Sequence, residues 1–228
     1  MDFIFMLTRQ DRTIGDCLRL YDEIRPVGLK HIGFKDVGVD KSTLAKLTDA
    51  IRRDGATTYM EVVSTSPEDA LKSAQNAVEL GIDRLLGGTD VDGIMQITKG
   101  SKTDYYPFPG FPKGHPTKLG GKPDDIIKHC QSFMAKGCAG CDILAYRATE
   151  ADPIALVKAA RTGLGKGYLV VAGSVNSIDR ISEVAKAGAD AFTIGSAVFD
   201  GSYAPHKGSI LSQLEAVVAD CERVDKAT

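Results

Sequence analysis

Two glycine-serine turns near the end of the chain could bind an anion through the backbone. Gly173-Ser174 follows the apolar run 168–171, and Gly195-Ser196 follows the apolar run 191–194. Each run is typical of a buried parallel strand, and each turn precedes the expected start of a helix. Backbone N–H groups in such turns bind anions, and glycine allows a close approach because it has no side chain. The alternative is that these glycines only relieve crowding at the strand ends.

A lysine and a glutamate could supply acid–base chemistry from two neighbouring strands. In the runs 31–36 and 57–63 the apolar residues alternate so that they face outward toward helices, which turns Lys35 and Glu61 into the interior. Lys35 could form a Schiff base with a carbonyl substrate if burial lowers its pKa. It could instead stay protonated and stabilise an enolate while Glu61 moves the proton. The structural alternative is a buried salt bridge that fixes the packing.

Four further polar residues at strand ends are candidates for the same site. Asp90 follows the fourth expected strand and could transfer a proton or bind a substrate hydroxyl, or it could cap the next helix. Arg147 could pair with a carboxylate or a phosphate, or it could face solvent. Thr8 and Arg9 end the first expected strand and could donate hydrogen bonds to substrate oxygens.

The stretch 108–122 is rich in proline and glycine, and this composition predicts a long loop with neither helix nor strand. Long loops in compact domains are commonly functional or disordered. Lys113, His115 and Lys118 give this loop a cationic character suited to closing over an anionic substrate. The alternative is a surface insertion with no part in the site.

Repeated strand–helix units would position these residues. The sequence between the strands indicates where helices begin and end. Ser66-Pro67 predicts the capped start of a helix and Gly81 its end. Ser177 and Gly188 mark the start and the end of a later helix. The expected strands cover residues 3–8, 31–36, 57–63, 84–88, 105–108, 142–147, 169–172 and 191–194.

Eight parallel strands, each followed by a helix, predict an α/β fold, a single (β/α)8 TIM barrel with an eight-stranded inner sheet. The competing layout is an open doubly wound sheet. That layout usually carries a glycine-rich turn after the first strand, and residues 8–11 contain no glycine.

Length and composition fit one domain spanning residues 1–228. The net charge of −2 leaves no basic surplus for binding nucleic acid. No apolar stretch approaches the ~18 residues that span a bilayer, and residues 1–7 lack the basic leader of a signal peptide. Five scattered cysteines favour a reducing compartment, so we expect a cytoplasmic protein in which Cys138 and Cys141 are structural. The oligomeric state is open, although barrel helices often pair in homo-oligomers.

The segments 170–175 and 189–197 resemble the phosphate-binding turns of ribulose-phosphate-binding (β/α)8 barrels. This superfamily includes phosphoribosylanthranilate isomerase, indole-glycerol-phosphate synthase and several sugar-phosphate decarboxylases. The resemblance implies a substrate phosphate held by backbone N–H groups after strands seven and eight, at Gly173, Ser174, Gly195 and Ser196. Ser174 stands where a second glycine is common. Barrels of this group host many chemistries, so the resemblance supports a ligand class more than a reaction.

Several motifs are missing from the sequence. Of four histidines, only His31 falls in an expected strand, at its beginning, so a histidine metal centre like that of pentose-phosphate epimerases is not expected. The Asp-x-Lys-x-x-Asp pattern of the sugar-phosphate decarboxylases is absent, because Gly33 and Gly38 occupy its acidic positions around Lys35. Neither a dinucleotide fingerprint nor a Walker loop occurs, so we expect no metal and no organic cofactor.

Together these residues predict a cofactor-independent enzyme that acts on a small phosphorylated sugar or a related phosphate ester. The expected reaction is proton transfer next to a carbonyl, as in an isomerase or epimerase. Glu61 would move the proton, Lys35 would stabilise the oxyanion, and the two turns would hold the phosphate. The alternatives are a Schiff-base aldolase or lyase with Lys35 as nucleophile, and a non-catalytic barrel that binds a phosphorylated ligand.

Overall fold

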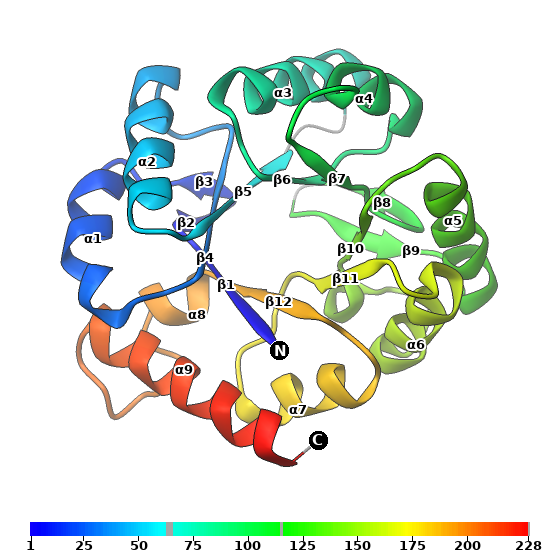
Figure 1. Cartoon of the computed structure of the whole chain (residues 1–228). Coiled ribbons are helices and arrows are strands. Elements are labelled where there is room, and N and C mark those ends of the chain that lie inside the picture. Colours follow the sequence, from blue (N-terminus) through cyan, green and yellow to red (C-terminus); the bar gives the residue numbers. More distant parts are fainter. Residues whose placement is uncertain (63–65, 115, 228) are drawn as a thin grey trace.

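The computed structural model describes residues 1–62, 66–114 and 116–227. Eight parallel strands form one sheet in the order β10-β11-β12-β1-β4-β5-β6-β7. Its edge strands meet through backbone hydrogen bonds from Ala139 N to Tyr105 O and from Asp142 N to Pro107 O, each 3.1 Å long. The sheet therefore curves into a nearly closed barrel, as Figure 1 shows, and the predicted TIM-barrel fold is confirmed. The barrel strands are β1 (Asp2–Met6), β4 (His31–Lys35), β5 (Thr57–Val62), β6 (Arg84–Gly87), β7 (Asp104–Tyr106), β10 (Gly140–Ile143), β11 (Tyr168–Val171) and β12 (Ala191–Ile194).

Helices connect the strands and ring the outside of the barrel (Figure 1). The side chain of Ser66 caps α3, accepting a hydrogen bond from Asp69 N, and this helix ends at Gly81 with φ of +66°. Ser177 caps α7 in the same way, so both predicted helix starts are confirmed. No helix in the described ranges combines the length and apolar character needed to cross a membrane. The helices are α1 (Cys17–Ile24), α2 (Lys41–Arg53), α3 (Pro67–Leu80), α4 (Val91–Thr98), α5 (Pro123–Ala135), α6 (Pro153–Leu164), α7 (Ile178–Lys186), α8 (Ser196–Phe199) and α9 (Ile210–Ala227), with 3-10 turns η1 (Arg25–Val27) and η2 (Ala145–Arg147).

The first barrel strand is shorter than predicted. It ends at Met6, and the chain then forms a small antiparallel hairpin of β2 (Thr8–Arg9) and β3 (Arg12–Thr13). The two turn residues, Gln10 and Asp11, have positive φ angles of 50° and 57°. Tight hairpins need such left-handed residues, and glycine usually supplies them. A Gln-Asp pair gives no such signal, so the sequence reading missed this hairpin.

The fifth and sixth barrel strands also differ from the prediction. β7 begins one residue earlier and ends two earlier than expected, and β10 begins at Gly140 rather than at Asp142. A Cβ atom on Gly140 would lie 1.8 Å from Tyr168 O, so only glycine allows β10 and β11 to pair this closely. The expected end of the strand, residues 145–147, instead forms η2, which lifts Arg147 off the sheet.

The stretch 108–122 contains regular structure, so the prediction of a loop without strands is wrong. β8 (Phe111–Lys113) and β9 (Lys118–Gly120) form an antiparallel hairpin in which Pro112 lies opposite Leu119. A two-stranded ladder leaves alternate N–H groups facing solvent, and proline is tolerated at such a position. Leu119 also forms a bridge to Ala148, and this places the hairpin beside η2.

The core has one layer inside the barrel and another between barrel and helices, because strand side chains alternate between the two faces. The outer layer includes Ile32, Phe34 and Met60, as the sequence predicts. Met6 and Tyr59 lie in the inner layer. The inward positions of Lys35 and Glu61 follow from this alternation, and the structure confirms them.

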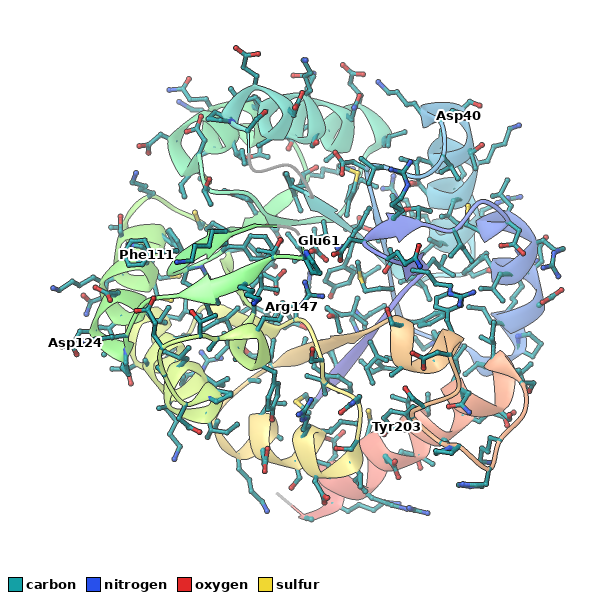
Figure 2. The ribbon with its side chains drawn as sticks, turned by 180° about the vertical axis from the view of Figure 1, so that it is seen from behind. Asp40, Glu61, Phe111, Asp124, Arg147 and Tyr203 are labelled. Carbon is teal, nitrogen blue, oxygen red and sulfur yellow. The ribbon has the colours of Figure 1, made fainter. Side chains whose placement is uncertain are left out.

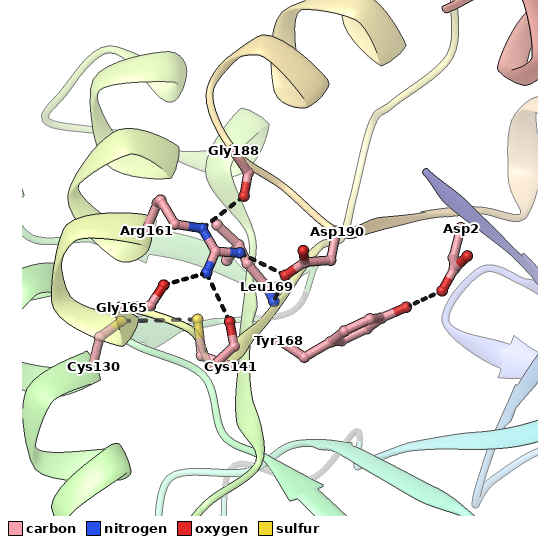
Figure 3. A network of polar contacts seen from close by, with 10 residues as sticks. Asp2, Cys130, Cys141, Arg161, Gly165, Tyr168, Leu169, Gly188 and Asp190 are labelled. Atoms are coloured by element: carbon pink, nitrogen blue, oxygen red, sulfur yellow. Dashed lines mark hydrogen bonds and ion pairs between the residues drawn. The ribbon is translucent and has the colours of Figure 1, made fainter. Parts of the chain in front are cut away.

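A polar network lies where strands β11 and β12 begin, at the end of the barrel opposite the carboxyl ends of the strands (Figure 3). Arg161 donates hydrogen bonds of 2.8 Å to the carbonyls of Gly165, Gly167 and Gly188, and one of 2.5 Å to Asp190 Oδ2. The same carboxylate oxygen accepts a hydrogen bond of 2.7 Å from Leu169 N. Because it satisfies backbone carbonyls and pairs a charge, we expect this network to stabilise the fold.

Replacement of Arg161 by lysine should lower the free energy of unfolding by about 2 kcal/mol, because one ammonium cannot reproduce the guanidinium's four hydrogen bonds. Urea unfolding followed by circular dichroism measures the loss. Arg19→Lys is the matched control, since Arg19 is an exposed residue that pairs with Asp16 and Glu23, close to it in the sequence. Equal losses in the two variants would show that the network does not stabilise the barrel.

Candidate active site

A cavity of about 250 Å³ opens at the carboxyl ends of the barrel strands. Figure 2 shows Glu61 and Arg147 toward the centre of the barrel, whereas Asp40, Phe111 and Asp124 lie toward its rim. In TIM barrels the carboxyl ends of the strands are where chemistry takes place. The polar residues that line the cavity include Thr8, Asp11, Lys35, Glu61, Arg147, Asn176, Asp200 and Ser202, together with the turns Gly173-Ser174 and Gly195-Ser196.

Lys35 is the central charged group of the cavity. It lies opposite Glu61 in the register of β4 and β5, and its side chain is only 6% exposed. Its Nζ lies 2.7 Å from Asp11 Oδ1 and 3.1 Å from Glu61 Oε1. Burial lowers the pKa of Lys35, but the carboxylates of Glu61 and Asp11 outweigh this effect and raise the net pKa above its ordinary value. Lys35 is therefore an ammonium group at neutral pH.

Asp11 is a site residue that the sequence reading missed. The β2–β3 turn carries it over the cavity, and Thr13 fixes the hairpin by exchanging two hydrogen bonds with the backbone of Lys35, at 2.7 and 2.9 Å. A Cβ atom on Gly38 would lie 2.2 Å from Thr13 O, so the hairpin packs directly on a glycine of the neighbouring strand's loop. The only signal in the sequence was an acidic residue shortly after the first strand.

Asp142 is the second missed residue. It lies on β10 between Cys141 and Ile143, which both belong to the outer core, so its side chain points into the barrel. It is fully buried, and neither carboxyl oxygen has a hydrogen-bond partner among the described residues. Burial, and then the nearby charge of Glu61, raise the pKa of Asp142 well above its ordinary value. The alternation used for Lys35 and Glu61 would have found this residue if β10 had been placed correctly.

The two glycine-serine turns line the same cavity. Gly173 and Ser174 have positive φ angles of 78° and 63°. Within the described part of the chain, the N–H groups of Gly173, Ser174, Gly195 and Ser196 donate no hydrogen bond to another residue. Four free donors around one concave surface are suited to an anion.

Both turns leave little space for a side chain at their glycines. A Cβ atom on Gly173 would lie 2.7 Å from Arg147 Nε, and one on Gly195 would lie 3.1 Å from both Met6 O and Thr8 Oγ1. The guanidinium of Arg147 thus packs directly against the first turn, where it adds positive charge to the cavity. Arg147 also lies 3.9 Å from Asp11, which links the anion-binding end of the cavity to the Lys35 cluster.

Other predicted site residues are not brought to the cavity. Arg9 is exposed on the far side of the β2–β3 hairpin, and Asp90 caps α4 by accepting a hydrogen bond of 3.0 Å from Gly93 N. Lys113 and Lys118 lie opposite each other on the exposed β8–β9 hairpin. His115 lies outside the described residues. Among the residues that the structure describes, no group of three His, Cys, Asp or Glu side chains could hold a metal ion.

Comparisons with known proteins support the fold. No family model matches this chain, and no curated protein matches it. Orotidine 5'-phosphate decarboxylase from Pyrococcus horikoshii is similar in structure, with a TM-score of 0.64 and 13% identity over 96% of this chain and 99% of that chain. Thiamine phosphate pyrophosphorylase from Pyrococcus furiosus has a TM-score of 0.63 and 12% identity over 97% and 95% of the two chains. A designed cube-shaped cage of fused symmetric oligomeric domains has a TM-score of 0.71 and 13% identity, over 100% of this chain and 74% of that chain.

Replacement of Lys35 by methionine should cost about 3 kcal/mol of unfolding free energy at pH 7, because Asp11 and Glu61 then lose their buried counter-charge. The raised pKa of Lys35 means that its contribution is fully present below the ordinary pKa of lysine and is lost as the pH rises through the folded-state value. The deficit of the variant should therefore shrink at alkaline pH, where the parent protein loses this contribution.

Urea unfolding at several pH values measures this deficit. Lys41→Met is the matched control, since Lys41 pairs with Glu79 on the exposed surface and should show a much smaller, nearly pH-independent change. A Lys35→Met variant as stable as the parent protein would show that the cluster is not an interdependent ionic unit.

Proposed function

We propose that this barrel is an enzyme that acts on a small phosphorylated sugar or a related phosphate ester, by proton transfer next to a carbonyl. The proposal rests on the shared cavity: a buried lysine between two carboxylates lies in the same cavity as two turns whose backbone donors have no partner among the described residues. Such a cavity offers one end to a phosphate and the other to a reacting carbonyl group.

The phosphate end would consist of the two turns and Arg147. Four backbone donors and a guanidinium suit a dianion, and the glycines allow it to approach the main chain. Holding the phosphate would also fix the rest of the substrate against the Lys35 cluster, so that binding energy from a remote group orients the reacting carbon. Two structural neighbours are named for phosphorylated compounds, which favours the same class of ligand here.

The reacting end would consist of Lys35 and Glu61. Glu61 accepts a proton from the carbon next to the carbonyl, while the ammonium of Lys35 stabilises the negative charge that develops on the carbonyl oxygen. The return of the proton from Glu61 to the neighbouring carbon, together with transfer of that carbon's hydroxyl proton to the former carbonyl oxygen, completes an isomerisation. An epimerisation instead requires that the original carbon is reprotonated on its opposite face. Both groups come from rigid strands at one register position, which keeps their geometry constant during the transfer.

The Schiff-base alternative is less well supported by the geometry. A lysine nucleophile needs a neutral amine, which enzymes obtain by burying it away from carboxylates or beside another cation. Lys35 instead contacts two carboxylates, and its pKa is raised. These contacts favour a permanent ammonium group and therefore the electrostatic role.

The Gly173→Ala variant should bind inorganic phosphate at least about tenfold more weakly, because the added methyl group pushes against Arg147 and obstructs the anion's approach. Isothermal titration calorimetry measures the affinity. Gly55→Ala is the matched control: Gly55 has a similar φ of +76° and open space around it, away from the cavity. Both variants should lose stability because of their positive φ, and Gly173→Ala should lose more because of its contact with Arg147, but only Gly173→Ala should lose affinity. Unchanged binding in Gly173→Ala would remove the first turn from the phosphate site.

The Glu61→Gln variant should lose solvent exchange at the carbon next to the carbonyl while it keeps phosphate binding, because the amide cannot accept the proton. Exchange in D2O, followed by proton NMR, is measured with phosphorylated aldoses and ketoses that stabilise the protein in a thermal-shift screen. Stabilisation by such compounds without any exchange in the parent protein would favour the non-catalytic barrel. A borohydride-trapped adduct on Lys35 would favour the aldolase.

A further inference from the structure

Asp142 is a buried carboxyl group for which the proposed reaction supplies no role. Its side chain has no exposed surface, and none of the described residues hydrogen-bonds either of its oxygens. Buried polar groups are almost always paired, because an unpaired carboxyl loses its hydration without compensation. An unpaired buried carboxyl beside a candidate active site therefore calls for a functional explanation.

The cations near Asp142 are already matched by other carboxylates. Lys35 contacts Asp11 and Glu61, and Arg147 lies 3.9 Å from Asp11. Two cations and two carboxylates leave no net positive charge for a third carboxylate. The charged groups that act on Asp142 are Glu61 from β5, Lys35 from β4 and Arg147 from η2, while its neighbour Cys141 is a fully buried thiol with a raised pKa and hence neutral. Ionised Asp142 would add an uncompensated charge inside the barrel.

The environments of Asp142 and Glu61 are strongly unequal. Glu61 has the Lys35 ammonium at 3.1 Å, which stabilises its charged form, whereas no cation or hydrogen-bond donor of the described residues contacts Asp142. When two nearby carboxyl groups compete for one proton, the less stabilised carboxylate takes it. The proton therefore belongs on Asp142.

We propose that Asp142 carries a proton in the resting protein, and that this neutral carboxyl leaves Lys35 as the counter-charge of Glu61, which acts as the base. Asp142 is a positioning residue, since it acts through Glu61 and does not line the cavity. The part of this inference that concerns Glu61 as a base rests on the proposed function. The part that concerns the proton on Asp142 does not.

The proton on Asp142 has a defined effect on stability. Since its folded-state pKa is raised, Asp142 contributes stability that is fully present below the ordinary pKa of aspartic acid and is lost as the pH rises through the folded-state value. Asparagine has nearly the same shape and cannot ionise. The melting temperature of Asp142→Asn, relative to that of the parent protein, should therefore rise steadily from pH 4 to pH 9.

Melting temperatures at these pH values, measured by calorimetry on the full chain, test this effect. Asp11→Asn is the matched control with the opposite sign, because Asp11 is the charged partner of Lys35 and its loss should lower the melting temperature at neutral pH. Infrared difference spectra of the parent protein minus Asp142→Asn should also contain the carbonyl band of a protonated carboxylic acid at pH 7. If Asp142→Asn does not fold, Asp142→Leu serves as the second neutral variant.

The kinetic test uses the solvent-exchange reaction. Ionisation of Asp142 at high pH places a second negative charge beside Glu61 and Lys35, so kcat/KM of the parent protein should fall there; in Asp142→Asn this alkaline fall should move up by about one pH unit or more. If kcat/KM of Asp142→Asn falls at the same alkaline pH as that of the parent protein, the proposed effect of Asp142 on Glu61 would be overturned. A pH-independent difference in melting temperature together with a missing infrared band would overturn the proton assignment. If the proton is found but no substrate exchanges, the proposed function alone has failed.

Discussion

Burial of the Lys35 ammonium is the constraint on which the arrangement of the site depends. A cation inside a barrel is tolerated only where carboxylates surround it closely, because desolvation otherwise costs more than any single contact returns. Asp11 and Glu61 meet this requirement from two sides. The exchange of hydrogen bonds between Thr13 and the backbone of Lys35 holds the β2–β3 hairpin in place, so the cluster couples local turn geometry to the barrel sheet.

The two ends of the barrel divide stability and reactivity between them. At the amino end of the strands, Arg161 and Asp190 satisfy three backbone carbonyls and one backbone N–H group (Figure 3). At the carboxyl end, backbone donors of both glycine-serine turns and both oxygens of Asp142 have no partner among the described residues. Proteins commonly break local packing rules at functional sites, where a ligand supplies the missing partners. This difference in hydrogen bonding between the two ends of the barrel supports a ligand site at the carboxyl end of the strands.

Similarity in fold and similarity in chemistry are separate matters for this chain. The solved structures that resemble it share 12–13% of its sequence, so they establish the barrel and leave the reaction open. Within a common barrel, the reaction depends on which side chains the strand ends present. Here these are an ammonium flanked by carboxylates and a fully buried carboxyl group, held beside a surface of backbone donors.

Local patterns in the sequence were enough to predict the repeated strand–helix order, the inward positions of Lys35 and Glu61, and the two turns, since each depends on a short period or a few adjacent residues. The folded chain also brings Asp11 and Asp142 to this end of the barrel, and it leaves Arg9, Asp90, Lys113 and Lys118 away from the cavity. The position of Asp11 depends on the β2–β3 hairpin, whose turn residues have positive φ although neither is glycine. The position of Asp142 depends on where β10 begins. Neither leaves a local pattern, because contacts between distant segments determine both.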